Sequence, residues 1–285
     1  MNNLNEITVN IPTLNEQRNI FACIKSVQNA GIKKIVVIDG GSTDDTLKIV
    51  KKFKNIKLIN AKKKGLANQR RIGVLNSKTK YIALIDADMR PKKNCFKFML
   101  KDLSSSNFVG VEAIIKPDKI KNYFDKSYQE IMDIHINKSG PRKMIGTPTL
   151  WKSKVLKKYN FDPFFTGPSD DTDLCYRVYK KGHVFGGSRG QVLHVHRSNL
   201  KDFYKKYTWY GKGDAQFILK HPERLISILK HQIYNYPIKI SCRMILKGSF
   251  TAIPFPICAG FLRFYGMIIF LFSRLICKKE KIYNT

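Results

Sequence analysis

The segment YIALIDADMR, residues Tyr81–Arg90, decides how this chain is interpreted. Its first half is apolar or aromatic and favours a buried β-strand. The strand ends in Asp86, Ala87 and Asp88, and residues two positions apart lie on the same side of an extended chain. Two carboxylates held side by side repel each other, and each makes the other harder to ionise. The segment therefore predicts a strand end that a cation would stabilise.

The segments on the amino-terminal side of this strand alternate between strand and helix patterns. In chain order they predict a strand at ITVNIP, a helix at residues 15–30, a strand at KKIVVIDGG, a helix at residues 43–53, a strand at IKLINA and a helix at residues 65–75. Ser42 is the predicted N-cap of the second helix. Such alternation is typical of an α/β fold, so we predict a mainly parallel sheet with helices on both faces.

Three polar clusters follow the predicted strand ends, at residues 12–16, 39–43 and 86–88. Ligands of open α/β sheets bind beyond the carboxyl ends of the strands. Carboxylates are hard oxygen ligands that suit Mg²⁺ or Mn²⁺, and such ions usually bind through one or two carboxylates plus substrate phosphates. We therefore expect a phosphorylated ligand at this edge. The alternative interpretation of Asp86 and Asp88 is a solvated pair without a metal.

The second half of the chain is less regular. It predicts a strand at FVGVEAIIK, a mostly polar helix at residues 120–137, a helix at residues 172–181 behind an acidic cluster, and a strand at GQVLHVH. From residue 197 onward there are sixteen Lys/Arg against four Asp/Glu, together with long apolar stretches. The character of the chain thus changes near its last third.

The composition allows several partners. With 52 Lys+Arg against 21 Asp+Glu, the formal net charge is +31, which could attract nucleic acid, an anionic membrane or a phosphorylated substrate. The alternative explanation of the charge is a lysine-rich composition whose side chains are simply solvated. Nothing resembles a nucleic-acid-binding motif, so we expect no nucleic-acid partner. The six cysteines form no CxxC pair, and the polar start MNNLNE lacks a signal-peptide pattern.

Several segments follow one another in a characteristic order: IPTLNE, VIDGGSTDDT, GLANQRRIG, LIDAD, FDPFFTGPSDDTDLCYR and HVH. This order resembles the family-2 glycosyltransferases, enzymes of the GT-A fold that use nucleotide sugars. The resemblance covers residues 7–213. We therefore expect a GT-A-like domain over residues 1–213 and a helical region, membrane-associating, over residues 214–285.

The resemblance implies a nucleotide-sugar site made of Pro12, Thr13, Asn15, Glu16, Asp39, Gly41, Ser42, Arg70, Asp86 and Asp88. Within it, Asp39 matches the acid that recognises the base, and Arg70 matches an arginine near the phosphates. The family usually has Asn where this chain has Arg71. The segment WYGKG, residues 209–213, is either a basic loop over the donor diphosphate or a plain helix-to-loop turn.

The resemblance also implies metal and catalytic residues. Asp88 matches the ligand of a divalent cofactor, Mn²⁺ or Mg²⁺, and Asp86 contacts the ribose or a metal-bound water. His194 matches a late histidine of the metal shell, and a structural role is its alternative. Asp170 and Asp171 match a Glu-Asp pair whose second member is the catalytic base.

The implied activity is inverting transfer of a sugar from a nucleoside-diphosphate sugar, with a UDP-sugar as the first guess, to a lipid-linked or glycan acceptor. Two alternatives are a basic nucleic-acid-binding protein and a non-catalytic nucleotide-sugar binder. Salt-dependent nucleic-acid binding without nucleotide-sugar binding would favour the first, and donor binding without turnover would favour the second.

The apolar run over residues 250–277 predicts contact with a membrane. It is interrupted by Pro254, Pro256, Arg263 and Arg274. We interpret it as an interfacial helix or hairpin with Lys278, Lys279 and Lys281 at the headgroups, on the cytoplasmic face, peripheral or shallowly inserted. A buried core helix, an oligomer contact and a transmembrane helix are the alternatives.

Overall fold

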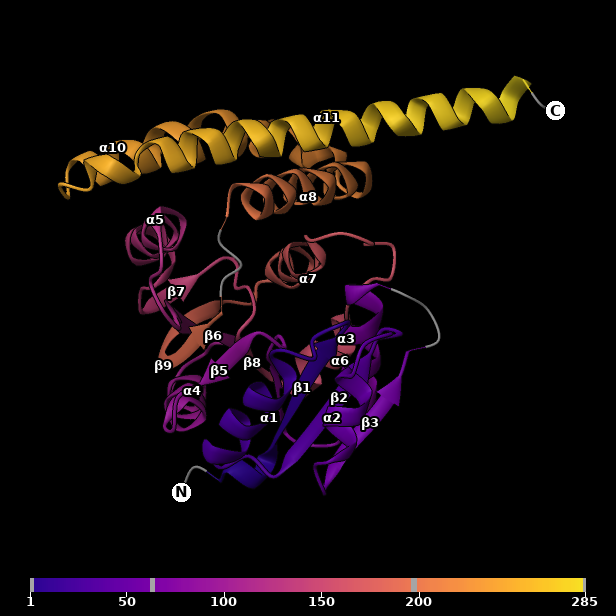
Figure 1. The fold of residues 1–285 in the computed structure, drawn as a ribbon, viewed down its shortest axis with the longest axis vertical. Helices are drawn as coiled ribbons and strands as arrows, with labels where there is room; N and C mark the ends of the chain where they lie inside the picture. Colours follow the sequence, from indigo (N-terminus) through magenta and orange to yellow (C-terminus); the bar gives the residue numbers. More distant parts are fainter. Residues whose placement is uncertain (1–2, 62–64, 196–198, 284–285) are drawn as a thin grey trace. The chain divides into compact units, whose positions relative to one another are not determined.

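The computed structural model describes residues 3–61, 65–195 and 199–283. The chain divides into two compact units, an α/β unit and a helical unit. The α/β unit comprises most of the chain up to β9, and the helical unit comprises α5, the segment after it, and the elements from α8 onward (Figure 1). The predicted boundary after residue 213 falls inside helix α8 (Leu200–Lys220), because that helix continues without a break.

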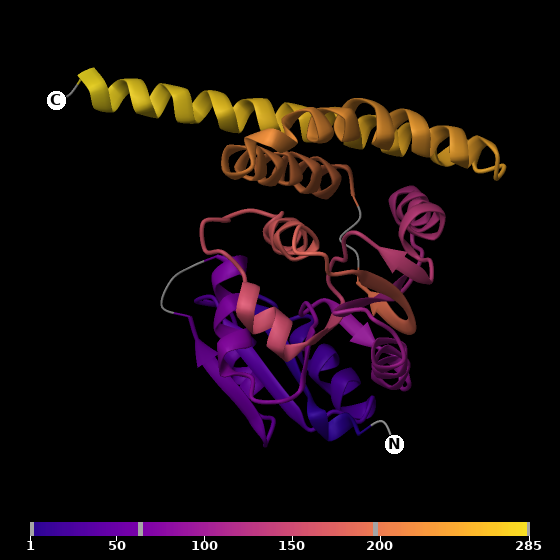
Figure 2. The same ribbon diagram turned by 180° about the vertical axis from the view of Figure 1, so that it is seen from behind.

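A mixed sheet lies at the centre of the α/β unit (Figures 1 and 2). Its strands within the described residues are β1 (Ile7–Thr13), β2 (Lys34–Asp39), β3 (Ile56–Asn60), β4 (Tyr81–Leu84), β5 (Met89–Pro91), β6 (Gly110–Pro117), β7 (Gly140–Arg142), β8 (Thr149–Lys152) and β9 (Phe185–His194). Their order is β3-β2-β1-β4-β8-β6-β9-β5, and β7 pairs with β9.

The predicted parallel sheet corresponds to one block of this arrangement. Strands β1 to β4 pair in parallel, whereas β8 runs antiparallel to both β4 and β6, and β5 and β7 run antiparallel to β9. All seven residues of β1 are buried, as expected for a central strand covered on both faces. The antiparallel pairs reverse the sheet beyond β4, so the fold is confirmed as α/β with a mixed rather than a uniform sheet.

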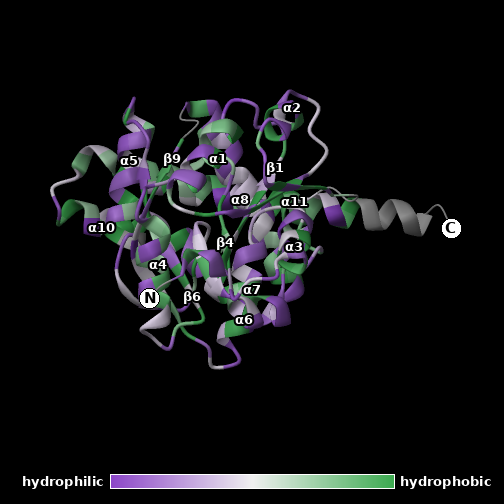
Figure 3. Ribbon diagram, turned by 90° about the horizontal axis from the view of Figure 1, so that it is seen from below, coloured by the Kyte–Doolittle hydropathy of each residue, from purple (hydrophilic) through white to green (hydrophobic). Residues whose placement is uncertain are grey.

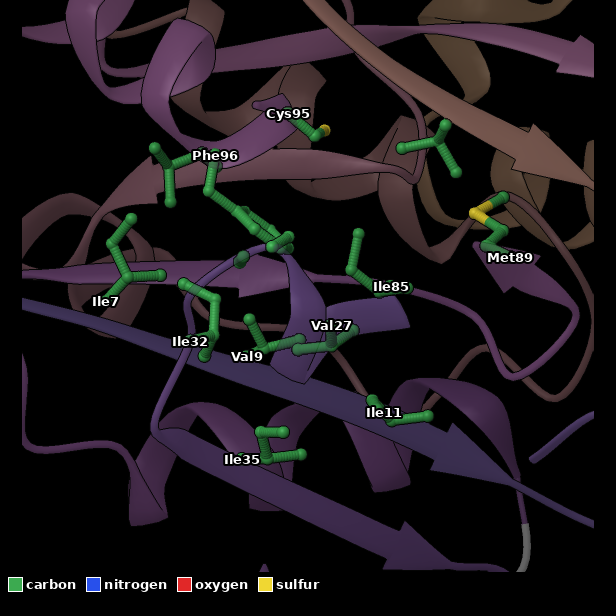
Figure 4. Close-up of a cluster of buried hydrophobic side chains, with 14 of the residues drawn as sticks. Ile7, Val9, Ile11, Val27, Ile32, Ile35, Ile85, Met89, Cys95 and Phe96 are labelled. Carbon is green, nitrogen blue, oxygen red and sulfur yellow. The ribbon is translucent and has the colours of Figure 1, made fainter. Parts of the chain in front are cut away.

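Helices cover the sheet and complete its core. They are α1 (Ile20–Asn29), α2 (Thr46–Lys51), α3 (Leu66–Asn76), α4 (Cys95–Ser104), α6 (Ser153–Tyr159) and α7 (Asp170–Tyr179), with a short 3-10 turn, η1 (Leu4–Glu6), before β1. Figure 4 shows Val9 and Ile11 of β1, and Ile85 directly after β4, packing against Val27 of α1 and Phe96 of α4. Burial of these side chains stabilises the α/β unit.

Two helices begin later than the sequence predicts. Helix α1 begins at Ile20 and not near Asn15, because Asn15 has φ 56° and belongs to a turn. Helix α2 begins at Thr46, and its flanking residue is Asp45. The prediction of Ser42 as its N-cap is wrong, because the Ser42 hydroxyl donates to Asp39 instead.

The helical unit contains α5 (Tyr123–Ile131), the π-helical segment η2 (Met132–Ile136), α8, η3 (Pro222–Arg224), α9 (Leu225–Lys230), η4 (His231–Lys239), α10 (Ile240–Ile245), η5 (Phe250–Ala252) and α11 (Pro254–Tyr283). Helix α5 carries both hydrophilic and hydrophobic residues (Figure 3). Its hydrophobic residues join an aromatic core around Phe203, Tyr207 and Phe255. This core belongs to the helical unit alone.

Helices α8 and α11 lie side by side (Figures 1 and 2). Gly211 of α8 lies against the backbone of Arg263, and Gly266 of α11 lies against that of Thr208, so that a Cβ at either glycine would collide with backbone. Both interpretations of residues 209–213 as a loop or turn are wrong, because this segment is helical and its glycines permit close helix packing.

Most of the apolar run lies in one helix, α11, and its first three residues form η5. Pro254 and Pro256 lie in the first turn of α11, where proline is tolerated, so the hairpin alternative is wrong. Residues 250–276 are long and apolar enough to cross a membrane by length and composition alone. The predicted headgroup contacts of Lys278, Lys279 and Lys281 fall on side chains outside the described residues.

Candidate active site

The turn after β2 holds Asp39 in one position. Its Oδ2 accepts hydrogen bonds from the backbone N–H groups of Gly41 and Ser42 at 2.8 and 2.9 Å, and the Ser42 hydroxyl donates to Oδ1 at 2.6 Å. Gly41 has φ 95°, a conformation that favours glycine. Asp39, predicted to recognise the base, is therefore built into the turn at the edge of the sheet.

The loop after β1 is joined to the loop after β2 by polar contacts. The Oδ1 of Asn15 accepts from the backbone N–H of Thr43 at 2.8 Å, while the Asn15 N–H donates to the Ser42 hydroxyl at 2.9 Å. The N–H of Glu16 donates to Oγ1 of Thr46 at 2.8 Å. These contacts bring Asn15, Glu16 and Ser42 together at the ends of β1 and β2.

Gln69 of α3 connects the ends of β1 and β2 next to Gly40. Its Nε2 donates to the carbonyl oxygens of Thr13 and Ile38, both at 2.8 Å, and its side chain is buried. Gly40 lies so close to Gln69 that a Cβ there would press on the amide. Gln69 was not among the predicted site residues, although its place as a polar residue inside GLANQRRIG was a signal.

Arg70 connects two carboxylates that lie far apart in the chain. Its Nη1 donates to both carboxylate oxygens of Asp170 at 3.0 Å, and its Nη2 donates to those of Asp86 at 3.1 and 3.4 Å. The guanidinium also lies over the ring of Phe161, 5.7 Å from its centroid. The Arg70 side chain is only 5% exposed, so these charges interact in a poorly solvated environment.

Burial shapes the ionisation of this cluster. Burial raises the pKa of Asp170 to about 6, against the opposing effect of Arg70 and with a contribution from the neighbouring Asp171 carboxylate. Burial also raises the pKa of Asp86, Arg70 opposes this shift, and the nearby Asp88 carboxylate adds to it. The Arg70 guanidinium is thus shared by the Asp86 and Asp170 carboxylates, and the Asp88 and Asp171 carboxylates lie nearby.

Strand pairing brings Asp88 and His194 together. Met89 and His194 are direct partners in the β5–β9 ladder, and the Val195 N–H donates to the Asp88 carbonyl oxygen at 3.0 Å. His194 Nε2 lies 3.2 Å from Asp88 Oδ2. The two predicted metal ligands therefore meet at one point, whereas the third, Asp86, has its carboxylate on Arg70.

Asp88 and His194 together offer a small donor set for a divalent ion. A carboxylate and an imidazole suit Mn²⁺, and an ion held by one or two protein ligands usually completes its shell with phosphate and water. In the part of the chain that the structure describes, no three His, Cys, Asp or Glu side chains gather around one point. Asp88 and His194 therefore fit an ion that binds together with a phosphorylated ligand.

Helix α7 presents the other acidic pair. Asp170 and Asp171 open its first turn, where the helix dipole favours negative charge. Asp170 is buried against Arg70, whereas Asp171 is half-buried and its Oδ1 accepts from the Thr172 N–H at 2.7 Å. Asp171 is therefore more accessible to solvent than Asp170.

A further carboxylate approaches this pair from the sheet. Glu112 of β6 is buried, and Asp171 is among the groups that raise its pKa. Glu112 was not among the predicted site residues, although its place as a charged residue within the apolar run FVGVEAIIK was a signal.

The family model "Glycosyl transferase family 2" matches residues 8–171, more than half of the chain. An uncharacterized glycosyltransferase of Rickettsia conorii is 38% identical over 109 residues, which cover 36% of this chain. The chain spans only 18% of the length of that relative. A Methanococcus voltae enzyme, dolichyl N-acetyl-alpha-D-glucosaminyl phosphate 3-beta-D-2,3-diacetamido-2,3-dideoxy-beta-D-glucuronosyltransferase, is 29% identical over 76% of this chain and 75% of its own length.

Two solved structures share the fold. Staphylococcus aureus TarS 1–349 in complex with UDP-GlcNAc superposes with a TM-score of 0.55 at 13% identity, covering 87% of this chain and 79% of TarS. GalNAc-T7 with UDP, GalNAc and Mn²⁺ superposes with a TM-score of 0.55 at 15% identity, covering 74% of this chain and 50% of that protein. At sequence identities this low, the structural similarity shows a common fold alone.

Proposed function

Because the chain belongs to glycosyl transferase family 2 and is thus a glycosyltransferase, we propose that its donor is a nucleoside-diphosphate sugar, a UDP-sugar in the first instance. We propose a lipid-linked or glycan acceptor and inversion at the anomeric carbon. The observation that carries this proposal is Arg70, which joins the strand-end Asp86 to Asp170 at the start of α7. It links the predicted donor edge of the sheet to the predicted catalytic helix.

The donor half of the proposal is supported by the loops after β1 and β2. Ligands of α/β sheets bind at such strand ends, and here Asn15, Ser42 and Asp39 form one connected turn cluster. The TarS and GalNAc-T7 structures contain UDP-GlcNAc and UDP, respectively. A UDP-sugar is therefore the first donor to test.

The catalytic half assigns the base to Asp171. A general base must reach the proton that it removes, and Asp171 is the more accessible of the two neighbours. Asp170 is held by two hydrogen bonds from Arg70 and is almost fully buried, which suits a residue that positions Arg70. Asp171 would accept the proton of the acceptor while the nucleoside diphosphate leaves.

We propose that Asp88 and His194 hold a Mn²⁺ or Mg²⁺ ion, as their contact and donor chemistry allow. When bound, the ion supplies positive charge for the departing diphosphate. Asp86 keeps the Arg70 guanidinium in place beside this pair. The contact with Arg70 makes Asp86 a positioning residue more than a direct ligand.

A donor panel tests the assignment. The full chain is incubated with UDP-, GDP- and dTDP-sugars, a membrane lipid extract and Mn²⁺ or Mg²⁺, and released nucleoside diphosphate and labelled product are measured. We expect one donor class to give both. Binding without turnover would support the non-catalytic alternative. Neither binding nor turnover, with steeply salt-dependent binding of RNA or DNA, would support the nucleic-acid alternative.

We also propose that α11 lies on an anionic membrane surface, at the cytoplasmic face. Its exposed apolar side chains recur at helical spacing and so share one face, namely Ile257, Phe261, Tyr265, Ile269 and Phe272. An apolar stripe on a basic protein fits an interfacial helix. The name of the M. voltae relative includes a dolichyl phosphate sugar, which supports a lipid-linked acceptor.

The membrane proposal is tested on the exposed stripe, because Phe255 and Ala259 of the same helix belong to the core. Phe261 and Phe272, 69% and 61% exposed, are both changed to Glu. We expect this double variant to lose binding to vesicles containing anionic lipid while keeping its thermal stability. Lys220→Glu at the end of α8 is the control for added negative charge. Unchanged vesicle binding by the double variant would contradict the proposal.

A further inference from the structure

A pocket lies at the amino-terminal ends of the parallel strands, at the opposite edge of the sheet from the candidate active site. Its volume is about 610 Å³, and its lining includes residues at the starts of the neighbouring strands β1, β2 and β3 (Figure 1). Lys34 begins β2 and Asp39 ends it, so roughly 17 Å of extended strand separate the pocket from the Asp39 turn. A ligand of this pocket would therefore be distinct from the proposed sugar donor.

Positive charge dominates the lining of this pocket. One acidic residue, Glu6, takes part in it. Five lysines line it as well, namely Lys33, Lys34, Lys57, Lys78 and Lys80. Five positive charges against one negative charge leave a net charge of +4. Within residues 3–61, 65–195 and 199–283, none of these lysines forms a salt bridge with a carboxylate, so their charge can act on a ligand.

Strand register places two of these lysines on one face of the sheet. Lys57 of β3 is the partner of Val36, and Lys34 lies two positions before Val36, so both lysine side chains point to the same face. Lys34 is the partner of Thr8, which in turn is the partner of Ile82. Three neighbouring strands thus contribute side chains to one polar surface where they begin.

The turn between α3 and β4 adds two further lysines to this surface. The hydroxyl groups of Thr8 and Thr79 share a hydrogen bond of 2.7 Å, and the Thr79 hydroxyl donates to the Tyr81 carbonyl oxygen at 2.8 Å. Lys78 and Lys80 flank Thr79 in the chain. The turn that carries both lysines is therefore attached to the start of β1.

Two of the lysines have neutral partners that leave their charge in place. The Lys57 Nζ donates to Oδ1 of Asn76, the last residue of α3, at 2.8 Å. The Lys80 ammonium lies 5.4 Å from the centroid of the Tyr81 ring. Neither partner carries a negative charge. Ammonium groups that converge in this way repel one another, and an anion between them turns the repulsion into attraction.

The charge and the size of the pocket match a small molecule with two phosphate groups. A phosphate monoester carries a charge of about −1.5 to −2 at pH 7, so two of them bring roughly three to four negative charges. Lysine binds phosphate as a point charge. Small-molecule sites usually have volumes of about 300–1,000 Å³, a range that includes this pocket.

We propose that this pocket binds an anionic ligand with two phosphate monoester groups, held by the lysines at the starts of β2, β3 and β4. The binding site is separate from the donor site and does not depend on the sugar that the enzyme transfers. The phosphate groups belong either to a soluble bisphosphate or to lipid headgroups, and the two sources are distinguished by experiment.

Calorimetry on the full chain tests this proposal with fructose 1,6-bisphosphate as the probe. EDTA and excess UDP are present, so that metal-dependent binding at the donor edge does not contribute. We expect the bisphosphate to bind about tenfold more tightly than fructose 6-phosphate, which lacks one phosphate, and to weaken as salt is added. Displacement of the bisphosphate by UDP would overturn the separate site.

Lysine variants test the location. Lys34→Gln/Lys80→Gln is expected to weaken bisphosphate binding at least about tenfold, with unchanged thermal stability because both residues are exposed. The matched control is Lys97→Gln/Lys101→Gln, which removes two exposed lysines of α4 outside the pocket and should keep wild-type affinity. Equal losses in both variants would mean that binding follows net charge alone, which overturns the proposal.

Vesicles of phosphatidylcholine with phosphatidic acid, a lipid whose headgroup is a phosphate monoester, test the second source. Both lysine variants keep α11 unchanged, so a difference between them reports on the pocket. Weaker vesicle binding by Lys34→Gln/Lys80→Gln alone, without bisphosphate binding by the wild type, assigns the phosphate groups to lipid headgroups. Bisphosphate binding with equal vesicle binding assigns them to a soluble ligand. Neither lysine-dependent effect would overturn the proposal.

Discussion

Each unit of the molecule contains an arginine that pairs with a buried aspartate, and the two arginines differ in how their charge is balanced. Arg70 of the α/β unit is shared by Asp86 and Asp170, with more carboxylates close by. Arg263 of the helical unit pairs with Asp214 at 2.5 and 2.8 Å, and Gln232 donates to the same carboxylate at 2.7 Å. The Arg70 cluster has surplus negative charge, whereas the Arg263–Asp214 pair is neutral.

This difference in charge balance distinguishes a cluster that can bind a ligand from one that only stabilises the fold. A closed one-to-one ion pair satisfies its own charges and has little left for a ligand, so its effect is on stability. A guanidinium shared between two carboxylates leaves negative charge that a metal, a proton or a hydroxyl can compensate. Four predictions test this contrast, in order of expected effect.

Asp171→Asn is expected to reduce turnover about 100- to 10,000-fold, the usual range for loss of a general base. The amide keeps the shape but cannot accept the proton. Donor affinity should stay at the wild-type value, measured by calorimetry. Asp170→Asn belongs to the same series, and a larger loss of turnover there would move the base to Asp170.

Arg70→Lys is expected to reduce turnover about 10- to 100-fold, because lysine keeps the charge but cannot reach both carboxylates with a planar fork. Steady-state kinetics with the active donor measure this loss. Arg71→Lys is the matched control, since Arg71 is exposed and its guanidinium donates to the Phe161 carbonyl oxygen at 3.4 Å. Equal losses in both variants would remove the special role of Arg70.

Arg263→Met should affect stability and leave the chemistry unchanged. It strands the Asp214 carboxylate inside the helical unit, which costs about 3–5 kcal/mol for a broken buried pair. Urea unfolding measures the loss. The double variant Arg263→Met/Asp214→Leu should recover much of it, because it removes both charges. A drop in kcat with unchanged stability would make this pair part of the site.

Glu112 is expected to make stability depend on pH in the ligand-free protein. Its pKa is raised from 4.5 to about 7, so the folded state binds more protons than the unfolded state between these values. Stability should therefore fall as pH rises from about 4.5 to 7, by about 3 kcal/mol at most from this group. Thermal unfolding of Glu112→Gln should show a flatter curve, and an unchanged slope would contradict the assignment.

Local sequence patterns were enough to predict the strand-end residues. Asp86, Asp88 and Asp39 each follow an apolar run, and the carboxyl ends of parallel strands meet at one edge by geometry. The partners of these residues were not predictable in the same way. The Asp170 partner of Arg70 lies 100 positions away, and no local pattern encodes that distance.

The wrong predictions for residues 209–213 and Ser42 also result from contacts that local sequence does not encode. Residues 209–213 look like a loop because glycine is unfavourable inside a helix. Contact with Arg263 and its neighbours on α11 offsets this preference, and that contact requires another helix. Ser42 has the features of an N-cap, yet the side chain of Asp39 receives its hydroxyl hydrogen bond. In both places tertiary contacts outweigh local propensity.

The β5–β9 ladder has a consequence for how the chain acquires activity. Asp88 and His194 are 106 positions apart, and they meet only after β9 has paired with β5. Contacts of such large sequence separation are slow to form because a long loop must close first. A nascent chain that has exposed only residues 8–171, the extent of the family match, still lacks β9 and therefore the His194 contact. Emergence of β9 from the ribosome is thus the earliest moment at which the paired Asp88–His194 site can exist.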